Sequence, residues 1–230
     1  MAEKRRVLVV AAHPDDEILG AAGTMAMHAR AGDHVSILIL GGGEESRGAP
    51  RADAEAAKAS LAHAAHEAAG VVGAELLAVQ DLPDNAFDSV PLLKIVKLVE
   101  AFLERTDPDA IYTHHAGDLN IDHQLTCRAV ITGSRAQGGR TPDIYSFEVR
   151  SATDYGDALP SLVPFRPNVW RVLDAEAVAA KMLALKAYSN EMRAWPHSRS
   201  MRAVQALLEH RGAQVGVPTA EALMLLRQVR

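Results

Sequence analysis

Imidazole and carboxylate side chains gather in two short segments that lie far apart in the chain. The first, His13–Glu17 (HPDDE), directly follows an apolar run, and the second is Asp118–His123 (DLNIDH). His13 and Asp16 are three residues apart across an expected strand-to-helix turn, and His123 would come from the start of another helix. Two histidines and one carboxylate, with one position left for water, are typical of a catalytic zinc site. These three residues therefore predict a catalytic zinc centre.

The chemistry of such a centre requires a further carboxylate. Zinc lowers the pKa of its bound water from about 9 for the free aqua ion to about 7, and it polarises a carbonyl oxygen. A second carboxylate beside the water then acts as general base. Asp15 is the candidate, because it neighbours a ligand in sequence without being needed as one. Once protonated, Asp15 can return the proton to a leaving amine, so the residues predict metal-assisted amide hydrolysis.

Alternating strand and helix patterns place these segments at one edge of a sheet. The expected strands are Arg6–Ala12, His34–Leu40, Glu75–Val79 and Asp109–Thr113, and the expected helices are Glu17–Ala31, Ala52–Ala69, Pro91–Arg105 and one beginning near Asp122. This order predicts an α/β fold with a mainly parallel sheet and helices on both faces. Ligands bind beyond the carboxyl ends of the strands in such sheets, and the two acidic segments lie at those ends.

The alternation of strand and helix patterns is less regular after Gly133. We expect further strands at Asp143–Val149 and Asn168–Val172, and helices at Ala175–Tyr188 and Ser200–Arg211. The simplest account is one domain over residues 1–230, with a C-terminal elaboration from about residue 140.

Composition narrows the function classes. The 230 residues are 48% hydrophobic and carry a formal net charge of −5, and they contain no basic block. Nucleic-acid binders usually present a cationic face, so that class is disfavoured. The single cysteine, Cys127, excludes an internal disulfide framework, and no apolar stretch approaches the length of a membrane span. We therefore expect a cytoplasmic protein that neither binds nucleic acid nor spans a membrane.

The two acidic segments, read together, resemble a known family. The sequence AHPDDE after a strand, followed later by THHAGDLNIDH, resembles the LmbE-like, or PIG-L, zinc-dependent N-deacetylases. That family includes deacetylases of N-acetylglucosaminyl phosphatidylinositol and of the sugar precursors of mycothiol and bacillithiol. The resemblance to one bacterial branch extends over nearly the whole chain, through Asp84-Asn85, Asp88, Pro91–Glu100, Tyr112–His123, Phe147–Val149, Glu191–Ser200 and Arg211–Leu223. It implies a Rossmann-like α/β sandwich.

The resemblance also implies residue roles. His13, Asp16 and His123 would be the zinc ligands, one Zn²⁺ per chain, and Asp15 the general base. Asp122 would orient the base or a zinc ligand by contacting that side chain, without binding the metal itself.

The sequence departs from the family at one position. Many members carry a histidine three residues before the last ligand, placed to stabilise the tetrahedral intermediate, and here that residue is Asn120. Either Asn120 serves as a neutral hydrogen-bond donor, or His114 or His115 takes over the role. Only one of these two histidines can face the pocket if the segment is extended.

Four residues are candidates for substrate binding: Arg47, Asp84, His114 and Arg199. Arg47 follows a run of glycines and could meet a hydroxyl or phosphate group. Arg199 belongs to a basic cluster that would contact an anionic substrate group, a neighbouring subunit or only solvent.

We expect a zinc-dependent hydrolase that removes an N-acetyl group from an amino sugar or sugar conjugate. One alternative is an amidase that acts on a larger acyl group or a thiol conjugate. Others are a non-catalytic sugar-nucleotide binding module and a receiver-like signalling domain, although a receiver has no use for His13 and His123. The alanine-rich helix and the C-terminal helices could bury an interface, so a homo-oligomer remains open.

Overall fold

The computed structural model describes residues 4–42, 51–136 and 140–229, with the side chains of 51–54 outside the description. The strands are β1 (Arg6–Ala11), β2 (His34–Gly41), β3 (Glu75–Leu82), β4 (Ala110–His114), β5 (Asp143–Phe147), β6 (Val169–Val172) and β7 (Ala220–Arg227). The helices are α1 (Asp16–Arg30), α2 (Arg51–Val72), α3 (Leu92–Thr106), α4 (Ile121–Gly133), α5 (Thr153–Gly156), α6 (Ala175–Ala187) and α7 (Met201–Ala213), with a 3₁₀ turn, η2, at Phe87–Ser89.

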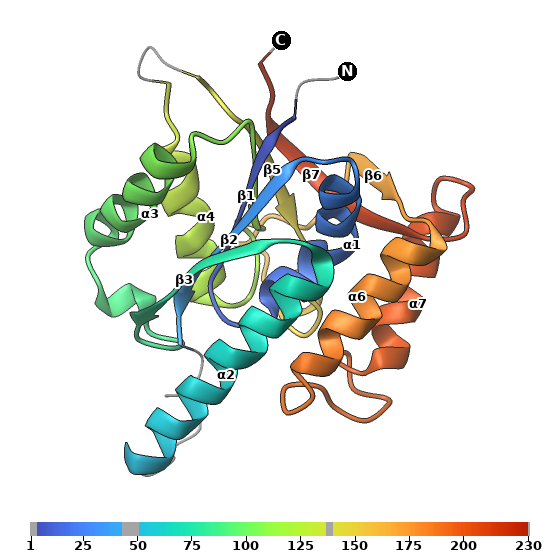
Figure 1. The fold of residues 1–230 in the computed structure, drawn as a ribbon, viewed down its shortest axis with the longest axis horizontal. Coiled ribbons are helices and arrows are strands. Elements are labelled where there is room, and N and C mark those ends of the chain that lie inside the picture. The colour runs from blue at the N-terminus through green and yellow to red at the C-terminus, as the bar shows by residue number, and fades with distance from the viewer. Residues whose placement is uncertain (1–3, 43–50, 137–139, 230) are drawn as a thin grey trace.

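The strands form one sheet in the order β3-β2-β1-β4-β5-β7-β6 (Figure 1). The strands from β1 to β5 pair in parallel, while β7 runs antiparallel to both β5 and β6. The predicted α/β fold with a mainly parallel sheet is confirmed. Strand β7 was not predicted, because its sequence AEALMLLR consists largely of good helix formers. Its pairing with β5 and β6 overrides that preference.

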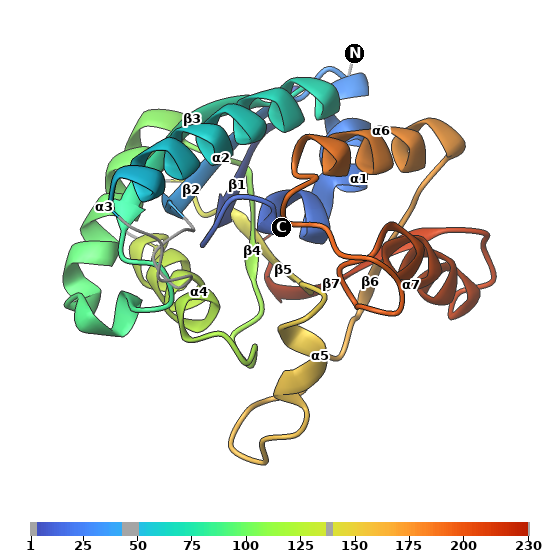
Figure 2. The same ribbon diagram turned by 90° about the horizontal axis from the view of Figure 1, so that it is seen from below.

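Helices cover both faces of the sheet. Alternate residues of β1 point to opposite faces, so Val7 and Val9 join the core beneath α1, α2 and α6, whereas Leu8 and Val10 join the core beneath α3 and α4. Figure 2 shows these two layers on either side of the strands. A strand buried on both faces explains the unbroken apolar run at the start of the chain.

Residues from the C-terminal part of the chain form hydrogen bonds to the backbone of α1. Helix α1 departs from helical geometry at Ala21 (φ −141°, ψ 16°), which frees backbone N–H groups within the helix. Gly23 N and Thr24 N donate instead to the carboxylate of Glu221 on β7, at 2.9 and 2.7 Å. Lys181 Nζ of α6 in turn lies 2.7 Å from Glu221. Residues from α6 and β7 therefore complete the helix that carries Asp16.

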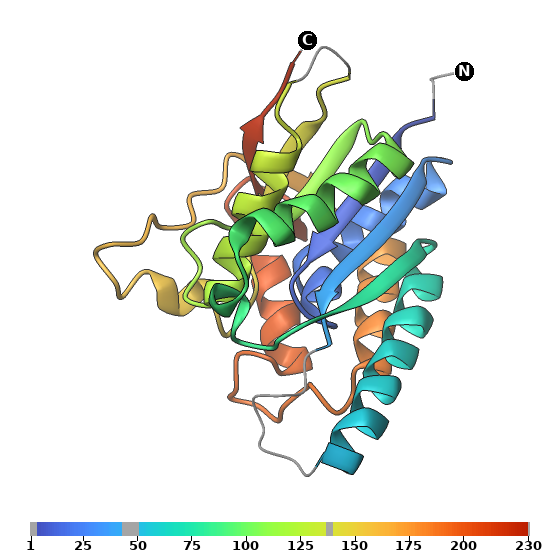
Figure 3. The ribbon, with the colours of Figure 1, turned by 90° about the vertical axis from the view of Figure 1, so that its left-hand side faces the viewer.

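Helix α5 and the loop that follows it project from the body of the molecule (Figure 3). The loop is held to the body of the molecule at Val163, whose carbonyl oxygen accepts a hydrogen bond from His115 Nε2 at 2.7 Å. Within the described part of the chain, no helix is both long and apolar enough to cross a membrane.

Candidate active site

The loop between β1 and α1 carries the first acidic segment in a strained conformation. Asp15, the residue before α1, has φ 95° and ψ −28°, a left-handed conformation that costs a non-glycine residue about 1–3 kcal/mol. Its backbone N–H donates to Glu17 Oε2 at 3.1 Å, and the other oxygen of Glu17 accepts from Tyr188 Oη at 2.7 Å. Burial raises the pKa of Glu17 to about 8. The strained turn is thus held by a buried side chain from the first turn of α1.

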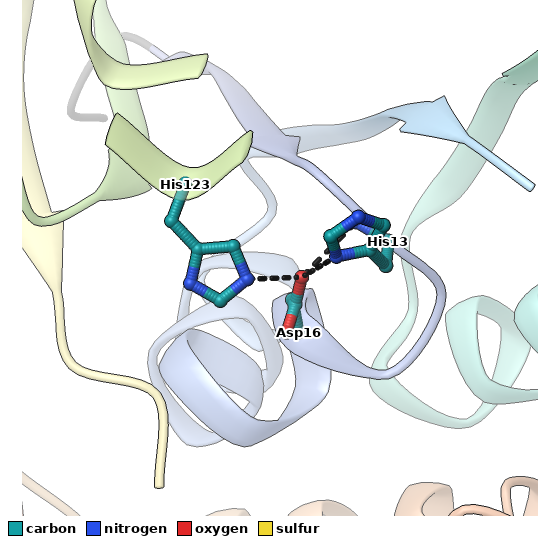
Figure 4. Close-up of side chains that lie close together, drawn as sticks. All are labelled: His13, Asp16 and His123. Atoms are coloured by element: carbon teal, nitrogen blue, oxygen red, sulfur yellow. Dashed lines mark hydrogen bonds and ion pairs between the residues drawn. The ribbon is translucent and has the colours of Figure 1, made fainter. Parts of the chain in front are cut away.

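His13, Asp16 and His123 meet at this edge of the sheet. Asp16 Oδ2 lies 3.3 Å from His13 Nδ1 and 3.2 Å from His123 Nε2 (Figure 4). One ligand atom from each residue lies within 4.8 Å of the other two. The second oxygen of Asp16, Oδ1, is buried and has no hydrogen-bond partner among the described residues. A buried carboxylate with one oxygen against two imidazole nitrogens and the other without a hydrogen-bond partner fits a bound cation.

The electrostatics of the cluster favour positive charge. Burial lowers the pKa values of both imidazoles, but the surrounding carboxylates raise them to about 10 for His13 and about 9 for His123. Burial would raise the pKa of Asp16, yet the neighbouring histidines lower it well below its ordinary value. The carboxylates thus stabilise two positive charges at this position, which is the charge that one divalent cation supplies.

Each histidine uses its other ring nitrogen to contact a carboxylate. His13 Nε2 lies 2.9 Å from Asp122 Oδ2 and 3.3 Å from Asp84 Oδ1, and His123 Nδ1 lies 3.2 Å from Asp118 Oδ2. Carboxylates in this position fix the tautomer and direction of metal-binding imidazoles. Asp122, which was expected to orient the base or a ligand without binding the metal itself, lies where it can orient His13. Asp84, expected on the substrate, lies against His13 as well.

Asp118 is a site residue that the sequence reasoning missed. Its Oδ1 accepts from Asn120 N at 2.9 Å, and its Oδ2 accepts from Thr153 Oγ1 at 2.6 Å. These bonds hold the carboxylate against His123. Its position in the DLNIDH segment, four residues after strand β4 ends at His114, was the signal available in the sequence.

Asp15 lies beside the cluster and pairs with an arginine from the C-terminal part of the chain. Arg199 Nη1 donates to Asp15 Oδ2 at 2.8 Å, and Arg199 Nε donates to Ser151 Oγ at 2.7 Å. Burial raises the pKa of Asp15 while Arg199 lowers it, and the pKa lies at about 7. A carboxyl group with a pKa near neutrality suits a general base.

The three candidates for oxyanion stabilisation are all engaged in other contacts. Asn120 Oδ1 caps α4 by accepting from Asp122 N at 2.8 Å, and its Nδ2 donates to Asn85 Oδ1 at 3.0 Å. His114 is fully buried behind His123, with ring centroids 3.9 Å apart. Its Nε2 accepts from the backbone N–H of Ala12 at 2.8 Å. His115, as described above, holds the projecting loop.

A cavity of about 410 Å³ opens beside the cluster. It is lined by Asn85, Leu119, Asn120, Ile121, His123, Ser151, Ala152 and Arg199. Of the substrate-binding candidates, Arg199 lines this cavity and His114 does not. Arg47 lies outside the described residues.

Residues 8–133 match the family model described as PIG-L, GlcNAc-PI de-N-acetylase. The chain belongs to the PIG-L family. The resemblance noted in the sequence is thereby confirmed, and His13, Asp16 and His123 all lie within the matched residues. No curated protein matches the chain.

Solved structures share the fold of this PIG-L protein over almost its whole length. N,N'-diacetylchitobiose deacetylase from Pyrococcus horikoshii has a TM-score of 0.77 at 15% identity, covering 97% of this chain and 84% of that one. The A40926 pseudoaglycone deacetylase Dbv21 has a TM-score of 0.74 at 17% identity, covering 97% of both chains. GalB, the 4-carboxy-2-hydroxymuconate hydratase from Pseudomonas putida KT2440, has a TM-score of 0.76 at 20% identity, also covering 97% of both. At these identities the likeness shows the fold.

Proposed function

We propose that this PIG-L family member is a zinc-dependent hydrolase that removes the N-acetyl group from an amino sugar or a sugar conjugate. The observation that carries the proposal is the cluster of His13, Asp16 and His123, with the carboxyl group of Asp15 beside it and a cavity alongside. Zinc held by these three residues would polarise the acetamide carbonyl and lower the pKa of water next to it.

The chain's own residues supply the proton transfers. Asp15 accepts a proton from the attacking water as the water oxygen bonds to the carbonyl carbon. When the C–N bond breaks, Asp15 gives this proton to the amine nitrogen, which leaves as a neutral amine. Asp122 and Asp118 keep the two imidazoles directed at the metal position. Asp122 Oδ2 is hydrogen-bonded to His13 Nε2, and Asp118 Oδ2 lies 3.2 Å from His123 Nδ1.

The size of the acyl group distinguishes this proposal from an amidase for larger substrates. Both functions would use the same metal and the same base, and only the acyl chain would differ. A series of N-acetyl, N-butanoyl and N-hexanoyl glucosamine derivatives separates them. We expect the N-acetyl compound to have the highest kcat/KM, and a preference for the longer chains would favour the amidase.

The hydrolase function is tested by acetate release. Zinc-loaded protein is incubated with N-acetylglucosamine, its 1-phosphate, its UDP conjugate and its alkyl glycosides, and free acetate and primary amine are measured together. Asp15→Asn should lower kcat by about 10²–10⁴-fold while zinc content is retained. Asp88→Asn, at an exposed position on η2, is the matched control and should behave as wild type. Full activity in Asp15→Asn would overturn the assignment of the base, and wild-type protein that releases acetate from none of these compounds would overturn the proposed function.

A further inference from the structure

The guanidinium group of Arg199 lies between the general base, the metal ligands and the cavity. Nη1 and Nε are bound to Asp15 and Ser151, as described above. Nη2 makes no hydrogen bond among the described residues but forms a long ion pair with Asp16 Oδ1, at 4.0 Å. That carboxylate oxygen has no hydrogen-bond partner there. The side chain is 23% exposed and lines the cavity together with His123. One donor nitrogen of Arg199 therefore makes no hydrogen bond to the described residues, and it lies on the side where the expected metal ligands meet the cavity.

Amide hydrolysis needs a donor for the carbonyl oxygen, on which negative charge develops. A buried donor aimed at that oxygen contributes a large part of catalysis. The position that many family members fill with a histidine is Asn120, whose oxygen caps α4 and whose amide nitrogen donates to Asn85. His114 and His115 are held away from the cavity by their own hydrogen bonds. Of the described residues that line the cavity, Arg199 alone carries a permanent positive charge.

We propose that Arg199 is a catalytic residue that stabilises the negative charge on the carbonyl oxygen of the substrate, replacing the histidine that this chain lacks at position 120. The proposal rests on the deacetylase function proposed above. It also means that the catalytic machinery extends beyond residues 8–133, because Arg199 and its partner Ser151 lie outside the part of the chain that matches the family model.

The charge balance of the reaction supports this role. In the first step the water oxygen bonds to the carbonyl carbon, the π electron pair of the carbonyl moves onto its oxygen, and the proton goes to Asp15. The negative charge thus leaves the Asp15 carboxylate as it appears on the substrate oxygen. In the second step the carbonyl re-forms, the C–N bond breaks with its electron pair going to nitrogen, and Asp15 returns the proton. Arg199 has an anionic neighbour throughout, first Asp15 and then the oxyanion.

Kinetics of Arg199 variants test the proposal. Arg199→Ala should lower kcat by about 10²–10³-fold with little change in KM, since the interaction forms mainly in the transition state. Added guanidinium at millimolar concentration should restore part of kcat in Arg199→Ala. Arg202→Ala is the matched control, because Arg202 is exposed on the next helix and packs on Trp195, with its guanidinium carbon 4.5 Å from the ring centroid. This control should keep wild-type kcat and should not respond to guanidinium.

A binding measurement separates this proposal from the proposed function. Acetate is titrated calorimetrically into zinc-loaded wild type, Arg199→Ala and Arg202→Ala, without any substrate. We expect the acetate affinity to fall at least tenfold in Arg199→Ala only. If wild type releases no acetate from any sugar but this loss is seen, the anion-binding role stands while the deacetylase function fails. Equal acetate affinity in all three proteins, or wild-type kcat in Arg199→Ala, would overturn the role of Arg199.

A folding defect in Arg199→Ala would not leave the question open. Ser151→Ala removes only the acceptor of Arg199 Nε, and Arg199→Lys keeps the charge without the fork of donors. Both variants should lower kcat by less than Arg199→Ala, with circular dichroism spectra and zinc content like those of wild type. Two folded variants with unchanged kcat and acetate affinity would contradict the proposal.

Discussion

Replacing Glu221 by alanine should destabilise the protein strongly, because this side chain completes the broken helix α1. Glu221 accepts from Gly23 N, Thr24 N and Thr24 Oγ1 at 2.6–2.9 Å, and it pairs with Lys181, whose Nζ also donates to the carbonyl oxygen of Leu19 at 2.7 Å. Lys181 and Glu221 are both almost completely buried. The substitution would leave a buried ammonium group without its counter-charge and two buried backbone donors without their acceptor.

The size of the effect follows from these contacts. Removing one partner of a buried ion pair costs about 3–5 kcal/mol, and each unsatisfied buried donor costs about 1–3 kcal/mol when water cannot reach it. These costs overlap, so we expect a loss of about 3–5 kcal/mol for Glu221→Ala. In a chain of this length that lowers the thermal midpoint by about 6–20 °C.

Urea denaturation followed by circular dichroism measures the loss. Glu176→Ala is the matched control, because Glu176 forms an exposed ion pair with Arg30 and its removal should leave the urea midpoint nearly unchanged. The double variant Lys181→Met with Glu221→Gln should lose less stability than the two single losses added together, since neither charge is then left unpaired. A loss below about 1 kcal/mol in Glu221→Ala would refute the reasoning.

Three further outcomes are expected. Asp118→Asn should weaken zinc binding by about 10–100-fold in a chelator competition, because the carboxylate that orients His123 is lost; unchanged affinity would contradict that role. Gly20→Ala should cost about 1–3 kcal/mol in urea denaturation, since a Cβ there would lie 2.2 Å from the ring of Phe147, and a wild-type midpoint would contradict this packing. Burial lowers the pKa of His28 below 6.5, so the stability that its neutral form confers is present above pH 6.5 and lost as pH falls. The free energy of unfolding of His28→Gln should therefore fall less than that of wild type between pH 7 and pH 5. Equal falls in the two proteins would contradict this.

The parallel part of the sheet was predictable from sequence because its strands other than the edge strand β3 are largely buried on both faces. The expected strand Arg6–Ala12 differs from β1 by one residue, and the expected Asp109–Thr113 is displaced by one residue from β4. Strand β7 escaped prediction because its residues favour helix, and only its partners in the folded chain make it a strand. The contact between Glu221 and α1 was not predictable either. No local sequence pattern indicates that α1 departs from helical geometry, or that a residue near the C-terminus accepts its free backbone N–H groups.

The convergence of the three expected metal ligands was predictable for a different reason. His13, Asp16 and His123 follow strand ends that a parallel sheet brings to one edge, so their convergence follows from the order of the elements. Side-chain direction was not predictable. The sequence left open which group would face the substrate, and the hydrogen bonds of Asn120 and His114 are set by contacts with other segments.

The most direct test of the account is the metal content of untagged protein purified without added metal, measured by plasma mass spectrometry. We expect about one zinc per chain in wild type and loss of that zinc in His13→Ala. His13, Asp16 and His123 offer two imidazoles and a carboxylate, and the other group of possible ligands, His13, Asp84 and Asp122, shares His13. His63→Ala, at an exposed position on α2, should retain the metal. Wild-type protein that contains no transition metal and takes none up on zinc titration would contradict the central claim.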